Sequence, residues 1–337
     1  MADRKQLLIV GVGSIGERHL RCFQSTGRAD VSICELNEDL RQKIGNQYQV
    51  EKQYADVDSA LADPHDCVVI ATPAHLHIAM SKQAVEAGLD LFIEKPLSTN
   101  FEGIDELQAL LQETRRKAAI AYVYRAHPAL AAMKADLDSG KFGKPVQLIV
   151  VSGQNFPTYR PAYRDIYYKS RELGGGAVQD ALTHSMNAGE YLVGPVDALV
   201  ADFSHQVLEG VDVEDTVHVI TRQGSVLGNF SLNQHQPANE SAITVVCERG
   251  MLRFEYQNSW YRWITEPESE WQIGFYETLE RDTLFQRQAN AFLDYLEDLC
   301  PPLCSFEDGV QTLAVNLSIL NSVEKRSWIE PADFISS

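Results

Sequence analysis

The chain has few basic residues and no long apolar run. Its 29 Lys and Arg residues stand against 47 Asp and Glu residues, which gives a formal net charge of −18. Nucleic acids and anionic membrane surfaces both require basic protein surface, so the sequence predicts neither as a partner. No apolar stretch reaches the roughly 20 residues that span a bilayer. The composition therefore favours a small molecule as the ligand.

Cysteine is also scarce, with six residues scattered along the chain. Only Cys300 and Cys304 lie close together, and no histidine or second cysteine pair accompanies them, so we expect no metal site. The first six residues contain no separate apolar segment with a cleavage site, so nothing there indicates a signal peptide. The sequence therefore predicts reduced cysteines and a cytoplasmic location.

The first motif is a glycine-rich loop that follows a short apolar run. Gln6–Val10 has strand length and is followed by Gly11-Val-Gly13-Ser-Ile-Gly16 and a helical pattern. In this fingerprint one glycine permits a tight turn, one lets the backbone approach a pyrophosphate, and one lets helix and strand pack closely. The N–H groups at the start of the helix then face the phosphates. The order predicts a dinucleotide-binding Rossmann unit.

An acidic residue stands where such a unit needs one. Glu35 ends the apolar run Val31–Cys34, 19 residues after Gly16. A carboxylate there accepts hydrogen bonds from the adenosine ribose and repels the additional phosphate of NADP. No arginine follows directly, so we expect NAD in preference to NADP. The alternative interpretation is that Glu35 is only a solvated strand end.

The length of 337 residues and the hydrophobic content of 45% indicate two domains, which we place at residues 1–125 and 126–337. The first third alternates strands with helical segments, which is typical of a doubly wound parallel sheet. After residue 143 strand patterns predominate, which predicts an α+β domain with a largely antiparallel open sheet. The fold class is therefore α/β. The expected strands are 7–10, 31–34, 67–71, 89–93, 119–122, 146–153, 198–203, 213–221, 226–232, 242–247 and 251–256.

Two motifs follow neighbouring strands of the predicted parallel sheet. Ala71-Thr72-Pro73 ends one strand and Glu94-Lys95-Pro96 ends the next, at the edge where such sheets bind ligands. The Lys95 ammonium there could bind a substrate hydroxyl and favour loss of its proton. The alternative is a surface lysine paired with Glu94.

A further motif combines a triple glycine with two polar residues. Gly174–Gly176 precedes Asp180 and His184, which are four residues apart and so share one helix face. Such glycines indicate backbone pressed against a ligand or a neighbouring segment. A carboxylate can orient an imidazole, which can take a proton from an alcohol as hydride leaves. The alternative is a structural Asp–His pair.

In this order the motifs resemble the Gfo/Idh/MocA oxidoreductases, which include inositol dehydrogenases and glucose–fructose oxidoreductase. The resemblance covers roughly residues 7–190. It has two departures: Asn187 stands where relatives often have an acid, and Ala181 stands where many have glycine. The matching residues are Gly11, Gly13 and Gly16 with His19, Ala71-Thr72-Pro73 with His77, Glu94-Lys95-Pro96, and the glycine run with Asp180 and His184.

The resemblance implies hydride transfer between a nicotinamide and a CH–OH group of a sugar, cyclitol or sugar derivative. It makes Lys95 and His184 the catalytic pair, with Asp180 binding or orienting the substrate. It also implies a Lys95–Pro96 bond that is often cis, and a homodimer or homotetramer. The expected cofactor-binding residues are Gly11, Gly13, Ser14, Ile15, Gly16, Glu35, Ala71, Thr72, Pro73, His77, Glu94 and Lys95.

A segment rich in tyrosine and arginine precedes the triple glycine, at residues 159–169. Such side chains suit sugar hydroxyls, carboxylates or phosphates, although a packed aromatic loop is the alternative. The expected substrate-binding residues are Lys95, Tyr124, Arg160, Tyr163, Arg164, Asp180 and His184. Two other functions stay open: a redox-neutral lyase or glycosidase that retains NAD, and a non-catalytic NAD-binding sensor.

Overall fold

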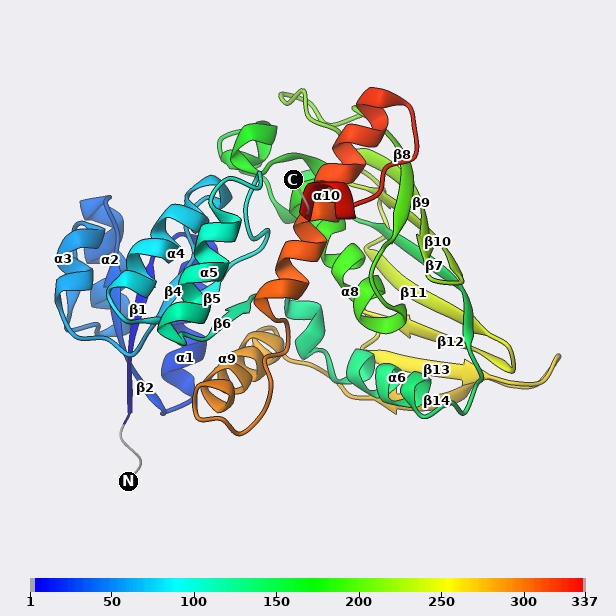
Figure 1. Cartoon of the computed structure of the whole chain (residues 1–337), viewed down its shortest axis with the longest axis horizontal. Helices are drawn as coiled ribbons and strands as arrows, with labels where there is room; N and C mark the ends of the chain where they lie inside the picture. Colours follow the sequence, from blue (N-terminus) through cyan, green and yellow to red (C-terminus); the bar gives the residue numbers. More distant parts are fainter. Residues whose placement is uncertain (1–3, 336–337) are drawn as a thin grey trace. The chain divides into compact units, whose positions relative to one another are not determined.

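The computed structural model describes residues 4–335, which divide into two compact units. The first unit combines the chain up to residue 123 with residues 280–309, and the second combines 124–279 with the chain from 310 onward. Residues 280–309 therefore return to the first unit, which the sequence division at residue 125 did not indicate. Each unit has its own sheet (Figure 1).

The first unit is built on a six-stranded parallel sheet in the order β3-β2-β1-β4-β5-β6. Its two central strands are buried at residues 7–10 and 67–70, as the apolar runs predict for a parallel sheet covered on both faces. The strands are β1 Lys5–Val10, β2 Ala29–Cys34, β3 Gln53–Tyr54, β4 Cys67–Ile70, β5 Asp90–Ile93 and β6 Ala118–Ile120.

Helices connect these strands, and local signals fix several of their ends. Asn37 caps one helix by accepting from the Leu40 N–H, and Asp56 caps the next by accepting from the Ser59 N–H. The helices are α1 Ser14–Ser25, α2 Glu38–Tyr48, α3 Val57–Ala62, α4 His77–Glu86, α5 Ile104–Thr114 and α9 Thr283–Leu296, with the short helix η1 Ala74–Leu76. The short helix η2 Val123–Ala126 begins with the last residue of the first unit's N-terminal segment and continues into the second unit.

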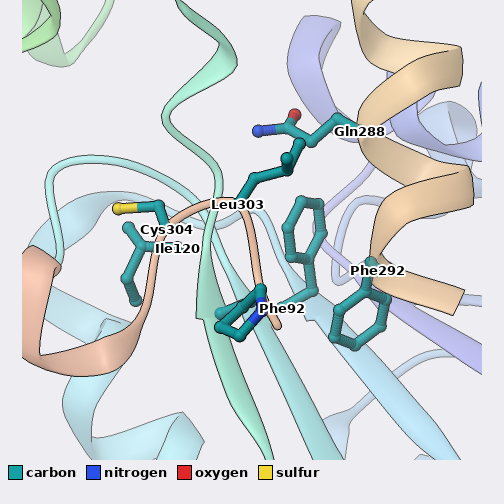
Figure 2. Close-up of a pocket in the computed structure, with 8 residues that line it drawn as sticks. Phe92, Ile120, Gln288, Phe292, Leu303 and Cys304 are labelled. Atoms are coloured by element: carbon teal, nitrogen blue, oxygen red, sulfur yellow. The ribbon is translucent and has the colours of Figure 1, made fainter. Parts of the chain in front are cut away.

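Helix α9 brings the later segment into this unit. Phe292 stacks on Phe92 with ring centroids 4.8 Å apart, and Arg28 pairs with Asp294 at 2.7 Å. Figure 2 shows a small cavity beside α9, lined by Phe92, Gln288 and Leu303 among others. Its volume of about 10 Å³ is near the lower limit for a cavity that can hold one water molecule. Both amide atoms of Gln288 are buried there with no hydrogen-bond partner among residues 4–335.

The second unit contains an eight-stranded sheet in the order β14-β13-β12-β11-β7-β10-β9-β8, in which only β10 and β7 are parallel neighbours. The prediction of one parallel sheet and one largely antiparallel sheet is confirmed. The strands are β7 Pro145–Gly153, β8 Ala198–Ser204, β9 Thr216–Gln223, β10 Val226–Asn233, β11 Glu240–Cys247, β12 Gly250–Glu255, β13 Trp260–Ile264 and β14 Gln272–Tyr276.

One face of this sheet packs against helices. Core side chains from it meet those of α6, α8 and α10 in one apolar cluster. On the opposite face, which we call the open face, Val151, Ile220 and Leu227 have exposed fractions of 38, 53 and 46%. The helices of this unit are α6 Pro128–Asp138, α7 Phe156–Tyr159, α8 Thr183–Val193, α11 Ala332–Ile335, most of α10 Phe306–Lys325, and the short η3 Tyr167–Lys169, η4 Arg171–Leu173 and η5 Val178–Leu182.

A search of the helices within residues 4–335 finds none with the length and apolar character needed to cross a membrane.

Candidate active site

The glycine loop between β1 and α1 forms a cradle of bare backbone. Gly11 has φ +85°, a conformation that favours glycine, and a Cβ there would lie 2.9 Å from the Ala71 carbonyl oxygen. A Cβ at Gly16 would overlap the Gly11 carbonyl. Gly13, by contrast, opens onto free space, and α1 begins after it without a side-chain cap. The first N–H groups of α1 are therefore free of a capping side chain, and the loop fits a pyrophosphate.

Glu35 lies against this loop. One carboxylate oxygen accepts from the Val12 N–H at 3.1 Å, and the other accepts from the Asn37 N–H at 3.0 Å. A carboxylate has about four acceptor positions, so these bonds orient the group and leave capacity for ribose hydroxyls. Arg41 donates to the backbone carbonyl of Glu35 at 2.6 Å, a neighbour that the sequence did not reveal.

The two strand-end motifs lie side by side. Their strands are parallel neighbours with Ile70 opposite Ile93, and the Glu94 N–H donates to the Ile70 carbonyl at 2.9 Å. Ala71-Thr72-Pro73 and Glu94-Lys95-Pro96 therefore leave the sheet at the same edge. The Lys95–Pro96 peptide bond is cis.

Buried polar groups hold the second of these loops. Glu94 accepts from the Lys95 N–H at 3.0 Å, and its other oxygen lies 2.6 Å from His19 Nε2. Burial alone would raise the pKa of Glu94, but the hydrogen bond from His19 and the charges of His19 and Lys95 lower it below its usual value. Glu94 is therefore a buried anchor of this loop.

His77, expected to bind the cofactor, is 1% exposed. Its ring lies between the two strand-end loops, with Nε2 2.8 Å from the Thr72 carbonyl oxygen and Nδ1 3.0 Å from the Pro96 carbonyl oxygen. Burial lowers the pKa of His77. A neutral imidazole has one N–H, so the ring donates to one of these carbonyl oxygens and lies close to the other.

In the second unit, the triple glycine is pressed against neighbouring protein segments. A Cβ at Gly175 would overlap the Tyr168 carbonyl, and one at Gly176 would overlap the Glu214 carboxylate. The buried Glu214 accepts from the Val178 N–H at 3.1 Å and pairs with Arg171 at 2.8 Å. Glu214 therefore fixes the start of the following helix, a role that no local sequence signal indicated.

That helix begins with a π-helical turn, η5, which contains Asp180, before α8 begins at Thr183. Single π turns often occur at functional sites. The Tyr167 hydroxyl donates to Asp180 Oδ1 at 2.7 Å, so one partner of this carboxylate comes from the segment before the glycines. The His184 ring stacks on Tyr124. Asp180, His184 and Tyr124 thus belong to one unit, and Lys95 belongs to the other.

The departure at Asn187 is part of a buried polar network. Asn187 accepts from Arg125 Nε at 2.9 Å and donates to the Thr312 hydroxyl at 3.0 Å. Thr312 in turn donates to the Glu190 carboxylate at 2.8 Å. Burial raises the pKa of Glu190 to about 7, although its hydrogen bonds from Thr312 and Gln311 oppose this. A buried acid is therefore present one turn after Asn187 on α8.

The segment rich in tyrosine and arginine, residues 159–169, which we call the Tyr/Arg segment, is hydrogen-bonded to the chain at residue 209. Tyr163 is buried and donates to the Glu209 carbonyl at 2.7 Å, and Arg164 donates to the same carbonyl at 2.8 Å. Arg160 is exposed. Tyr163 belongs to a small aromatic and aliphatic cluster that gives this segment a core of its own: Phe156, Tyr163, Tyr168, Leu208, Val211 and Val213.

Among residues 4–335, no three His, Cys, Asp or Glu side chains are grouped as metal ligands would be.

Comparison with known proteins matches each unit to a domain of the same protein family. Residues 5–122 match the model of an oxidoreductase family with an NAD-binding Rossmann fold, and residues 130–253 match the C-terminal domain of the Gfo/Idh/MocA proteins. Levoglucosan dehydrogenase of Pseudarthrobacter phenanthrenivorans is 24% identical, over 88% of this chain and 88% of the relative. Myo-inositol 2-dehydrogenase of Thermotoga maritima is 23% identical, over 97% of this chain and 98% of the relative.

A solved structure of levoglucosan dehydrogenase, in complex with NADH and levoglucosan, has the same fold. It superposes with a TM-score of 0.88 at 22% identity, over 97% of this chain and 99% of that one. The family resemblance inferred from the sequence motifs is confirmed by both domain models. The chain is an oxidoreductase of the Gfo/Idh/MocA family with an NAD-binding Rossmann unit.

Proposed function

We propose that this protein transfers a hydride between NAD and a CH–OH carbon of a sugar, cyclitol or sugar derivative. The observation that carries the proposal is a complete acid–base set, Lys95, Asp180 and His184, in a chain whose glycine loop fits a dinucleotide pyrophosphate. Relatives named for levoglucosan and inositol support this substrate class. NAD, when bound, supplies the hydride acceptor at nicotinamide C4.

Oxidation removes a hydride from the substrate carbon and a proton from its oxygen, leaving a carbonyl group. We assign the proton to His184, because an imidazole accepts protons near neutral pH. The Lys95 ammonium donates a hydrogen bond to the substrate oxygen and stabilises its developing negative charge. Asp180 binds and orients the substrate.

Glu35 supports NAD over NADP. Its carboxylate is held beside the glycine loop by the Val12 and Asn37 N–H groups, and its charge would repel a 2′-phosphate. Arg41 is engaged with the Glu35 backbone carbonyl. A Glu35→Ser variant should therefore bind NADP more tightly than the wild type does, measured by quenching of protein fluorescence with each cofactor.

For the substrate we propose contacts from Tyr124 and from the exposed Arg160, in addition to the three catalytic residues. Tyr163 and Arg164 contribute by holding the Tyr/Arg segment in shape through the Glu209 carbonyl. An exposed guanidinium at Arg160 suits hydroxyl or carboxylate groups of a sugar acid.

The test is NADH formation, followed by absorbance, with levoglucosan, myo-inositol and a panel of sugars and uronic acids. Lys95→Ala and His184→Ala should each lower turnover at least a hundredfold while NAD binding persists. Lys43→Ala, which alters an exposed lysine of α2, is the matched control. Unchanged turnover in both site variants would contradict the assignment. Substrate conversion without net NADH would indicate the redox-neutral enzyme, and NAD binding without any conversion would indicate the sensor.

We also propose a cytoplasmic homodimer or homotetramer that binds no nucleic acid. The apolar side chains Val151, Ile220 and Leu227 on the open face support a second copy as partner, since exposed apolar patches mark interaction sites. The acidic net charge supports the exclusion of nucleic acid.

A further inference from the structure

His77 is the first residue of α4 and directly follows the η1 turn after Pro73. Its buried ring reaches both strand-end loops, through the carbonyl oxygens of Thr72 and Pro96. The ring therefore lies between the two loops and contacts one backbone carbonyl oxygen of each.

The same loop is held from its other side. The Lys95 N–H donates to Glu94, and Glu94 in turn contacts His19 at 2.6 Å. The backbone on either side of the Lys95 side chain is thus fixed, by Glu94 before it and by His77 after it. A side chain that acts on a substrate gains most from such a rigid support, because small displacements of a reacting group cost large factors in rate.

We propose that His77 is a positioning residue for Lys95: its buried ring is held between the Thr72 and Pro96 carbonyls, donates to one of them, and so fixes where the Lys95 ammonium is presented. This role rests on the proposed function of Lys95. It replaces the direct cofactor contact that the sequence motif suggested for His77, because both ring nitrogens face protein carbonyls and the ring is buried.

The test compares His77→Phe, which fills the space without hydrogen bonds, with His77→Gln, whose amide can still donate to one carbonyl. The control is His65→Phe. His65 is another partly buried histidine of the first unit, which contacts Ser32 Oγ at 2.7 Å and the Asp63 carbonyl at 3.0 Å before β4 begins. Turnover is measured with levoglucosan and myo-inositol, and NADH affinity is measured by fluorescence.

We expect His77→Phe to lower kcat at least tenfold while the NADH Kd changes less than threefold, and His77→Gln to recover part of the loss. In a Lys95→Ala background, His77→Phe should change the residual rate less than threefold, because the two effects share one cause. A His77→Phe variant with normal kcat, or one whose defect is confined to NADH affinity, would overturn the proposal.

A measurement independent of turnover is amide hydrogen exchange followed by mass spectrometry. His77→Phe should accelerate exchange in peptides covering residues 71–77 and 94–98 by at least tenfold. The exchange rates of all other peptides, and the melting temperature, should stay close to those measured for His65→Phe. Unchanged exchange at 94–98 would contradict the positioning role. If Lys95→Ala leaves turnover intact, the proposed function fails, whereas the exchange result still decides whether His77 holds the loop.

Discussion

The Tyr124 ring stacks on the imidazole of His184, with centroids 5.5 Å apart and planes 20° from parallel. The Tyr124 ring also stacks on the ring of Tyr256, with centroids 4.7 Å apart. The plane of the His184 ring is therefore set by an aromatic pair as well as by its helix. Because burial raises the pKa of Tyr124, its hydroxyl stays neutral and adds no charge beside the imidazole.

Replacing Tyr124 by leucine should lower kcat roughly three- to tenfold, the range that corresponds to the loss of an aromatic contact of about 0.5–1.5 kcal/mol. Tyr124→Phe keeps the ring that stacks on His184 and loses the 3.3 Å bond to Ser241 and any hydroxyl contact with the substrate, so its kcat should fall less than that of Tyr124→Leu. Steady-state kinetics check both values. Equal defects in the two variants would indicate that the hydroxyl matters more than the ring.

Removing the Tyr167 hydroxyl should weaken substrate binding, because Asp180 loses a donor that holds one of its oxygens at 2.7 Å. Hydrogen bonds to charged groups contribute about 1.5–3 kcal/mol, so Tyr167→Phe should lower kcat/KM by roughly tenfold or more. Tyr159→Phe, at an exposed tyrosine of the same segment, is the control. A Tyr167→Phe variant that matches this control would show that the bond does not support Asp180 in turnover.

Glu190 should make stability depend on pH. Its pKa is raised to about 7 in the folded chain, so between pH 4.5 and 7 the folded state retains a proton that the unfolded state has lost. Ionisation of Glu190 therefore lowers the free energy of unfolding as pH rises through that window, by roughly 3 kcal/mol in total. Urea unfolding at pH 5 and pH 8 should show that Glu190→Gln removes much of the difference. An identical pH dependence in wild type and variant would contradict the expectation.

A charge on the open face should disrupt the proposed assembly. Ile220→Lys places an ammonium among exposed apolar side chains, whereas Leu299→Lys alters an exposed leucine of the first unit and serves as the control. Light scattering after size-exclusion chromatography should show a smaller species for Ile220→Lys alone. A monomeric wild type, or an unchanged mass for Ile220→Lys, would exclude this face as the contact.

Gln288 should be replaceable by methionine with a gain in stability, because its buried amide has no partner among residues 4–335. An unsatisfied buried polar group costs about 1–3 kcal/mol, so the melting temperature should rise by roughly 2–6 °C. Gln286→Met, at an exposed position of the same helix, is the control. A lower melting temperature would instead indicate an ordered water bonded to Gln288 in the cavity.

The sequence was most informative where structure and function depend on neighbouring residues. The glycine loop, Glu35 and the two strand-end motifs could be predicted because each lies within a few residues of a strand whose apolar pattern is clear. The parallel register of the strands then brings the motifs to one edge of the sheet without further information. The strands between residues 145 and 255 were predictable from their apolar runs and from the glycine or polar residues between several of them.

What the sequence did not reveal depends on distant contacts. Glu214 caps a helix that begins some 36 residues earlier, and Glu190 receives its hydrogen bond from Thr312 on another helix. The π turn at 178–182 has the same apolar pattern as an α-helix, so periodicity cannot distinguish them. Strand β14 is short, lies at the sheet edge and is largely exposed, so it carries no clear pattern of burial.

The return of residues 280–309 to the first unit means that the dinucleotide-binding half cannot be separated by a single cut. A fragment ending at residue 123 would lose the Phe292 ring that stacks on Phe92 and the Asp294 carboxylate that pairs with Arg28. The aromatic surface beneath α9 would then face water and favour aggregation. Transferring this half to another protein would therefore mean joining two separate segments of the chain. The whole protein is the smaller step to exchange.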